Sequence, residues 1–210
     1  MIRVPCRRGC RRSYGRQLAH AVVYHNAQTQ RPKWNAVGND LAFADTVRQI
    51  LSMEITAYHE AGHVFMALYL GARVRSVTIE PDRDDGPDRF GDTQVEWDLG
   101  RFTPRELHEK SVLVALAGPV AEMIHRGEPY HPGFVAEWAA DWREAWEAAA
   151  GVVPDPKQRL AYLEQATAQL YRLLRRDENW AALAAITDDL LAHETIEGEQ
   201  AEEIMQQWLP

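Results

Sequence analysis

The segment Ala57–His63 constrains this chain more than any other stretch, because it contains the pattern H-E-x-x-H. Residues four apart on a helix share a face, so His59 and His63 can present two imidazoles to one metal ion. Glu60 lies beside that face, where a general base must be to take a proton from metal-bound water. The alternative is a helix with two histidines and a solvated glutamate. We expect a metal site, with His59 and His63 as ligands and Glu60 as the base.

The residues around this motif predict a buried helix over about Ser52–Leu70, with Gly71 as its C-terminal stop. Apolar side chains occur on most sides of this helix, which is typical of a central helix in a core. Gly62 has no side chain and would let a neighbouring backbone approach closely. Because buried histidines need polar partners, this environment favours the metal site over the solvated alternative.

Charge is distributed unevenly along the 210 residues. The first 39 residues contain eight basic side chains and no acidic one, whereas the remainder carries 15 basic and 31 acidic residues. An acidic body argues against nucleic acid as a partner. The length, with 46% hydrophobic and 26% charged residues, predicts one globular domain with an added tail. We expect residues 1–38 to form a basic, flexible tail and residues 39–210 to form the folded domain.

Cysteine usage and hydropathy bear on the cellular compartment. The only cysteines, Cys6 and Cys10, form a single C-x-x-x-C pair, which is a weak metal signal and no disulfide scaffold. No apolar run approaches the roughly 18–20 residues of a membrane span, and the basic start lacks the apolar stretch of a secretory signal. We therefore expect a cytoplasmic protein without a transmembrane segment.

The pattern after the motif helix predicts a mainly α fold with one small β-hairpin beside that helix. Arg73–Glu80 alternates apolar and polar residues, a charged, turn-rich loop follows over 82–92, and Thr93–Trp97 has the pattern of a returning strand. Such a strand beside a metal cleft can hold an extended peptide, although a purely structural hairpin fits the order equally well. The remaining helices are expected over about Thr103–Arg126, Pro132–Ala150, Asp155–Arg176, Asp177–His193 and Gly198–Trp208.

Two acidic residues on these helices are candidates for the site. Thr103 and Glu106 form a capping box that begins the helix containing Glu122. Glu122 is either an exposed residue on the polar face or a carboxylate that orients a ligand histidine. Asp141 lies beside the tryptophans at 138, 142 and 146, a stripe more typical of a core than of a cofactor platform. Asp141 is either paired or metal-bound, or else a solvated acid at the edge of that stripe.

Four segments together resemble the peptidase domain of FtsH-type ATP-dependent zinc metalloproteases. Thr56–His63 resembles the active-site signature of that family. Val77–Pro81, followed by Gly91–Thr93, is similar to its V-T-I-x-P and G-x-T hairpin. Leu116–Glu122 resembles its A-G-R-x-A-E helix, and Leu190–Glu199 its L-L-x-x-E-T-L-x-G-x-E terminus. The order and approximate spacing of these segments agree with the family.

The resemblance, which covers about residues 45–208, implies a third metal ligand. The family's zinc takes two histidines and an aspartate from a later helix, and Asp141 stands at the matching position. The preceding T-G-A-x-N is replaced by Ala136–Ala140 here, so Glu137 and Glu122 remain alternative third ligands. Three protein ligands and one water make a tetrahedral catalytic zinc site.

The same resemblance implies a zinc metallopeptidase that hydrolyses peptide bonds in flexible or unfolded polypeptides. Pro119 replaces the arginine of A-G-R, and the chain has no Walker A glycine loop, so we expect a stand-alone, ATP-independent form. This form would act alone or with a separate ATPase or adaptor, and oligomerisation is left open. The alternatives are a non-catalytic metal-binding adaptor and a dedicated regulatory protease that cleaves one partner protein. The presence of Glu60 argues against the adaptor, because a structural metal site needs no base.

Overall fold

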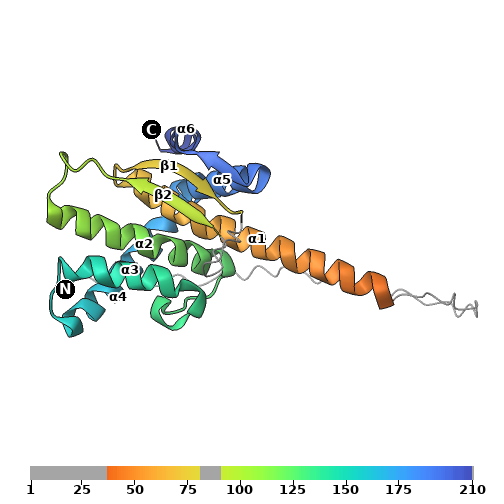
Figure 1. Cartoon of the computed structure of the whole chain (residues 1–210), viewed down its shortest axis with the longest axis horizontal. Coiled ribbons are helices and arrows are strands. Elements are labelled where there is room, and N and C mark those ends of the chain that lie inside the picture. Colours follow the sequence, from red (N-terminus) through yellow and green to blue (C-terminus); the bar gives the residue numbers. More distant parts are fainter. Residues whose placement is uncertain (1–36, 81–90, 210) are drawn as a thin grey trace, which may run out of the picture. The chain divides into compact units, whose positions relative to one another are not determined.

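The computed structural model describes residues 37–80 and 91–209 (Figure 1). The chain divides into two units, Met1–Val37 and Gly38–Pro210, and all but one of the described residues belong to the second. Almost all of the expected tail over 1–38, including Cys6 and Cys10, lies outside the described residues. Most of the loop expected over 82–92 also lies outside them.

The described part of the second unit contains six α-helices and a three-stranded antiparallel sheet, which confirms the expected mainly helical fold with a small β element. The helices are α1 (Val37–Tyr69), α2 (Pro104–Arg126), α3 (Ala139–Ala150), α4 (Pro156–Leu174), α5 (Asp177–His193) and α6 (Gly198–Trp208). The strands are β1 (Arg73–Thr78), β2 (Asp92–Glu96) and β3 (Thr195–Glu197). Two short 3-10 helices, η1 (Pro132–Phe134) and η2 (Ala136–Trp138), precede α3.

Helix α1 carries the H-E-x-x-H motif and begins well before the expected start at Ser52. No glycine or proline occurs between Asp40 and Ala61, so nothing in this stretch interrupts the helix. The helix ends at Tyr69, and Gly71 acts as its C-terminal stop, as expected: its φ of 83° allows two backbone hydrogen bonds of 3.0 Å to close the last turn. Within α1, the motif segment belongs to the most buried part of the helix.

The two sides of α1 are covered by different elements. In Figure 1 the sheet, α5 and α6 lie on one side of α1, and α2, α3 and α4 lie on the other. Gly62 permits the contact with α2, because a Cβ at this position would lie 2.5 Å from the backbone oxygen of Ala117. This confirms the expected close approach of a second backbone. Trp138 is 1% exposed, and Trp142 and Trp146 pack against the same core, so the tryptophan stripe is core, as expected.

The sheet has the strand order β2-β1-β3, so that β2 forms an edge. Strand β3 is an addition to the expected hairpin, and its Ile196 pairs with Val77 of β1. Both side chains are almost fully buried. Three residues are too few for an alternating pattern to be recognised in the sequence, and the partner strand lies more than a hundred residues earlier.

Helix starts agree with expectation at α2 and differ at α3. At α2 the capping box is confirmed: the Thr103 hydroxyl accepts from the Glu106 amide, and the Glu106 carboxylate accepts from the Thr103 amide at 2.7 Å. The expectation of a helix starting at Pro132 is wrong, because α3 starts at Ala139. The extended backbone of Val135, with φ −101° and ψ 119°, interrupts the helix between η1 and η2.

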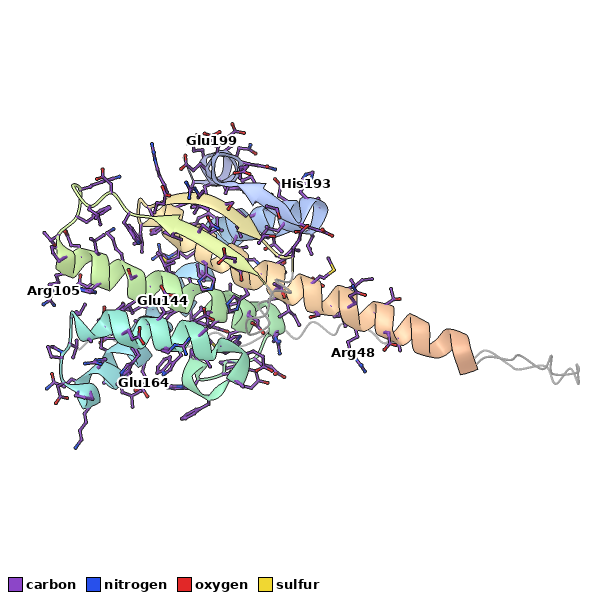
Figure 2. The ribbon with its side chains drawn as sticks, viewed as in Figure 1. Arg48, Arg105, Glu144, Glu164, His193 and Glu199 are labelled. Carbon is purple, nitrogen blue, oxygen red and sulfur yellow. The ribbon has the colours of Figure 1, made fainter. Side chains whose placement is uncertain are left out.

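Exposed charged side chains lie on the outer faces of several helices. Figure 2 labels Arg105 on α2, Glu144 on α3, Glu164 on α4 and Glu199 on α6. All four side chains are exposed. Among the helices of the described residues, none has the length and apolar character needed to cross a membrane.

Candidate metal centre

The structure brings His59, His63 and Asp141 together. The Nε2 atom of His59 lies 3.2 Å from Oδ2 of Asp141, and the Nε2 atom of His63 lies 3.5 Å from Oδ1. The centroids of the two imidazole rings are 4.8 Å apart. One ligand atom from each residue lies within 4.8 Å of the other two, so this group can hold a metal ion. These are the three ligands expected from the motif and from the family resemblance.

Two helices supply these ligands. His59 and His63 are one turn apart on α1, and Asp141 lies in the first turn of α3. Helix α3 packs against α2, which in turn contacts α1 at Gly62. The exposed fractions of the three side chains are 14%, 11% and 19%, respectively, so the group is largely shielded from water without being sealed.

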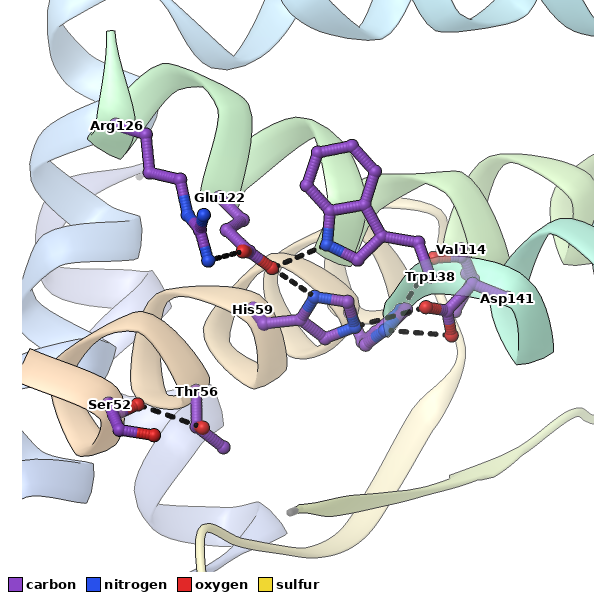
Figure 3. A network of polar contacts seen from close by, with 9 residues as sticks. Ser52, Thr56, His59, Val114, Glu122, Arg126, Trp138 and Asp141 are labelled. Carbon is purple, nitrogen blue, oxygen red and sulfur yellow. Dashed lines mark hydrogen bonds and ion pairs between the residues drawn. The ribbon is translucent and has the colours of Figure 1, made fainter. Parts of the chain in front are cut away.

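Each imidazole makes a polar contact through Nδ1, the nitrogen that faces away from Asp141. The Nδ1 atom of His63 lies 2.8 Å from the carbonyl oxygen of Val114, and that of His59 lies 3.2 Å from Oε2 of Glu122 (Figure 3). A carbonyl oxygen only accepts, so the hydrogen bond to Val114 requires the proton on Nδ1. In the neutral ring the lone pair is then on Nε2 of His63, the atom that faces Asp141 and could bind a metal. Such outer contacts are the usual means by which a ligand histidine is oriented.

Glu122 is buried and contacts Nδ1 of His59, so it is not an exposed residue on the polar face of its helix. Glu122 is 4% exposed; its carboxylate also accepts a hydrogen bond of 2.6 Å from Trp138 Nε1 and forms an ion pair of 2.5 Å with Arg126. Figure 3 shows Glu122 between Arg126, Trp138 and His59, with Asp141 at the other side of the His59 ring. Burial raises the pKa of Glu122, but the hydrogen bonds from His59 and Trp138 outweigh it and leave the pKa below its usual value.

The alternative third ligands do not join this group. Glu137 lies in η2 and is exposed. Glu122 contacts Nδ1 of His59, on the side of the ring away from Asp141. Among the described residues, the group that can hold a metal contains only His59, His63 and Asp141.

Gly118 leaves the space in which the two Nε2 atoms meet. A Cβ at this position of α2 would lie 2.3 Å from Nε2 of His63 and 2.7 Å from Nε2 of His59. Any side chain would therefore overlap with the ligand atoms. The absence of a side chain at Gly118 therefore leaves the two Nε2 atoms accessible to a metal ion.

The electrostatics of the group favour a positive charge. Burial lowers the pKa of His59, but contacts with Asp141 and Glu122 outweigh it and raise this pKa to about 10. Burial also raises the pKa of Asp141, but the hydrogen bond from His59 and the charges of both histidines leave it below the usual value. Two ionised carboxylates around the imidazoles are a suitable environment for a cation.

Glu60 is placed one residue after His59 and three residues before His63, so it borders the ligand face of α1. It is 7% exposed, and its Oε2 atom accepts a hydrogen bond of 2.6 Å from the hydroxyl of Thr93 in β2. The sequence alone does not identify Thr93 as the donor to Glu60, nor Trp138 as the donor to Glu122. For Trp138 a signal exists, since a buried indole N–H usually needs an acceptor.

Comparison with known proteins does not assign the chain to a family: no protein-family model matches it, and no curated protein matches it significantly. The geometry of the candidate metal centre is therefore the principal basis for a function.

Proposed function

We propose that this chain is a zinc-dependent metalloendopeptidase that resembles the FtsH-type peptidase domain. One observation carries the proposal: the ligand atoms of His59, His63 and Asp141 lie within 4.8 Å of one another, and Glu60 is buried on the same turn of α1 as His59. A metal held only for stability would not need that carboxylate. The arrangement instead supplies the ligands and the base of a hydrolytic site.

The donor set supports zinc as the metal. Two imidazole nitrogens and one carboxylate oxygen leave a fourth tetrahedral position for a water or substrate, as in catalytic zinc sites. Structural zinc sites are closed and rich in sulfur, whereas this group contains no cysteine. When bound here, Zn²⁺ would lower the pKa of a coordinated water and polarise the scissile carbonyl.

The residues of this chain then have separate tasks. Glu60 accepts a proton from the water that attacks the scissile carbonyl and delivers it to the leaving amine. Glu122 and the carbonyl of Val114 hold the imidazoles of His59 and His63 so that both Nε2 atoms face the metal position. Gly118 has no side chain that would overlap with these two atoms.

The sheet supports an extended polypeptide as the substrate. Within the described residues β2 pairs only with β1, and it contacts Glu60 through Thr93. The free side of an edge strand can pair with a peptide backbone in extended form. A folded substrate would first have to be opened, so we propose that the enzyme cleaves flexible or unfolded segments without ATP, alone or with a separate ATPase or adaptor.

Hydrolysis of casein by the zinc-loaded protein tests this function. Glu60→Gln should reduce the rate by about 100-fold or more, because general bases contribute about 10²- to 10⁴-fold. Zinc content should stay the same, since Glu60 is not a ligand. The matched control is Glu137→Gln, the same chemical change at an exposed site, and it should behave as wild type. Full activity of Glu60→Gln would refute the mechanism, and zinc binding without hydrolysis would favour the adaptor.

A further inference from the structure

The start of β2 is fitted closely to the side chain of Glu60. The hydroxyl of Thr93 lies 2.6 Å from Oε2 of Glu60. At Gly91 an added Cβ would lie 2.5 Å from Oε1 of the same carboxylate. The two oxygens of Glu60 are therefore approached by two residues of one short segment, and neither residue belongs to the metal-binding group.

The strand pattern explains why Thr93 faces Glu60. Side chains alternate along β2, with Asp92 and Gln94 exposed and Thr93 partly buried. Thr93 pairs with Val77 of β1, which is fully buried, so both lie on the inner face of the sheet. The absence of a side chain at Gly91 lets the backbone before the strand pass directly over the carboxylate.

The hydrogen bond has a defined direction. The Thr93 hydroxyl donates to Oε2 of Glu60, and a carboxylate that acts as a base can only accept. Among the described residues, this is the one hydrogen bond to the carboxylate of Glu60. The terminal torsion of a glutamate is broad and has no sharp minimum, so an unbonded carboxylate would rotate. One hydrogen bond to Oε2 fixes the plane of the carboxylate, and no hydrogen bond from the described residues occupies Oε1.

We propose that Thr93 is a positioning residue that holds Glu60 in the orientation for proton transfer. This inference rests on the proposed function, because it concerns the base of the proposed hydrolysis. Thr93 itself exchanges no proton with the substrate. It also belongs to the edge strand proposed to bind the peptide, so one strand aligns both the substrate and the base. Small displacements of a catalytic group can cost about 100-fold in rate.

Three substitutions separate positioning from packing. Thr93→Val keeps the branched shape and removes the donor, Thr93→Ala removes both, and Thr93→Ser keeps the donor and removes the methyl group. If Thr93 only filled space, valine would be the best replacement. If it positions Glu60, serine should be the best, and valine and alanine should be similarly poor.

The experiment measures kcat and KM for a flexible fluorogenic peptide, together with zinc affinity by competition with a chelator. We expect kcat to fall about 10- to 100-fold for Thr93→Val and Thr93→Ala, and less than threefold for Thr93→Ser. KM and zinc affinity should change by less than about threefold in all variants. In a Glu60→Gln background, Thr93→Val should cause no further loss. Thr195→Val, which removes a hydroxyl bonded to Thr78 elsewhere in the sheet, is the matched control and should keep wild-type kcat.

Different results would overturn the positioning role of Thr93 and the proposed function. Wild-type kcat in Thr93→Val, or an equal loss in Thr93→Ser, would overturn the positioning role while leaving the proposed function intact. An additional loss in the Glu60→Gln background would also overturn it, because Thr93 would then act independently of Glu60. Absence of zinc-dependent hydrolysis in the wild type would overturn the proposed function and the positioning role together.

Discussion

Trp138 donates its indole N–H to Oε2 of Glu122 at 2.6 Å, and the same oxygen lies 3.2 Å from Nδ1 of His59. One carboxylate oxygen thus connects Trp138, the residue preceding α3, with His59, the proposed metal ligand on α1. Arg126 holds the other oxygen of Glu122 at 2.5 Å. The orientation of His59 therefore depends on a buried carboxylate that is itself fixed on both sides.

Replacing Glu122 by glutamine should weaken zinc binding about 10- to 100-fold, the usual effect of removing an outer partner of a ligand histidine. The neutral amide has no negative charge to stabilise the His59 ring. Its NH₂ group would also face the N–H groups of either Trp138 or Arg126, so two donors would oppose each other. Competition with a chromogenic chelator measures the affinity. Glu137→Gln, at an exposed carboxylate, should bind zinc as the wild type does. Equal affinities for the two variants would show that Glu122 does not orient His59.

Replacing Trp138 by phenylalanine removes the N–H donor and keeps most of the buried ring. We expect weaker zinc binding, with a smaller change than for Glu122→Gln, because Glu122 keeps its contacts with Arg126 and His59. The unfolding free energy should fall by about 1–3 kcal/mol, since a buried acceptor loses a partner. Trp146→Phe is the control, because the guanidinium of Arg159 lies over the Trp146 ring at 4.9 Å. Unchanged zinc affinity in Trp138→Phe would limit the role of Trp138 to packing.

Replacing Gly118 by alanine should greatly reduce metal binding while preserving the helices. The new methyl group would lie 2.3 Å from Nε2 of His63 and displace it. Alanine favours a helix over glycine by about 1 kcal/mol, so α2 itself is not weakened. We expect at least a tenfold loss of zinc affinity with an unchanged circular dichroism spectrum. Gly100→Ala, where the new Cβ meets only the Asp98 side chain at 3.3 Å, serves as the control. Wild-type zinc binding in Gly118→Ala would contradict the assigned metal position.

The stability of the metal-free protein should depend on pH through His59. Its pKa is about 10 in the folded chain against 6.5 for an unperturbed histidine, so its contribution is complete below pH 6.5 and is lost towards pH 10. The unfolding free energy should decrease by at most about 1.4 kcal/mol per pH unit between pH 6.5 and 9. Asp141 and Glu122 have lowered pKa values, so their contribution is instead lost on acidification. Urea titrations of wild type and His59→Gln measure this dependence, and equal slopes above pH 6.5 would contradict it.

Local signals predicted much of the fold. The helix stop at Gly71 and the capping box of Thr103 and Glu106 are confirmed, because each depends on residues a few positions apart. Strand β3 was missed, because Ile196 finds its place only by pairing with a distant strand. The expected helix start at Pro132 is wrong, because the extended backbone at Val135 is not marked by a proline or glycine at that position.

The candidate site shows the same contrast between local signals and contacts of distant residues. His59, Glu60 and His63 follow from spacing on one helix, whereas the residues alone leave Asp141 open and only a family resemblance favours it as the third ligand. The contact of Thr93 with Glu60 joins a strand to a helix, and no short sequence pattern encodes such a contact. The contact of Trp138 with Glu122 likewise depends on how the segment before α3 packs against α2.

The central claim is that His59, His63 and Asp141 together hold one zinc ion with a position left open for catalysis. A crystal structure of the zinc-loaded protein, with anomalous data collected at the zinc edge, tests it most directly. We predict a single strong peak at about 2.0–2.2 Å from Nε2 of His59, Nε2 of His63 and one carboxylate oxygen of Asp141. A zinc ion bound elsewhere, or one that takes Glu122 or Glu137 in place of Asp141, would contradict the account.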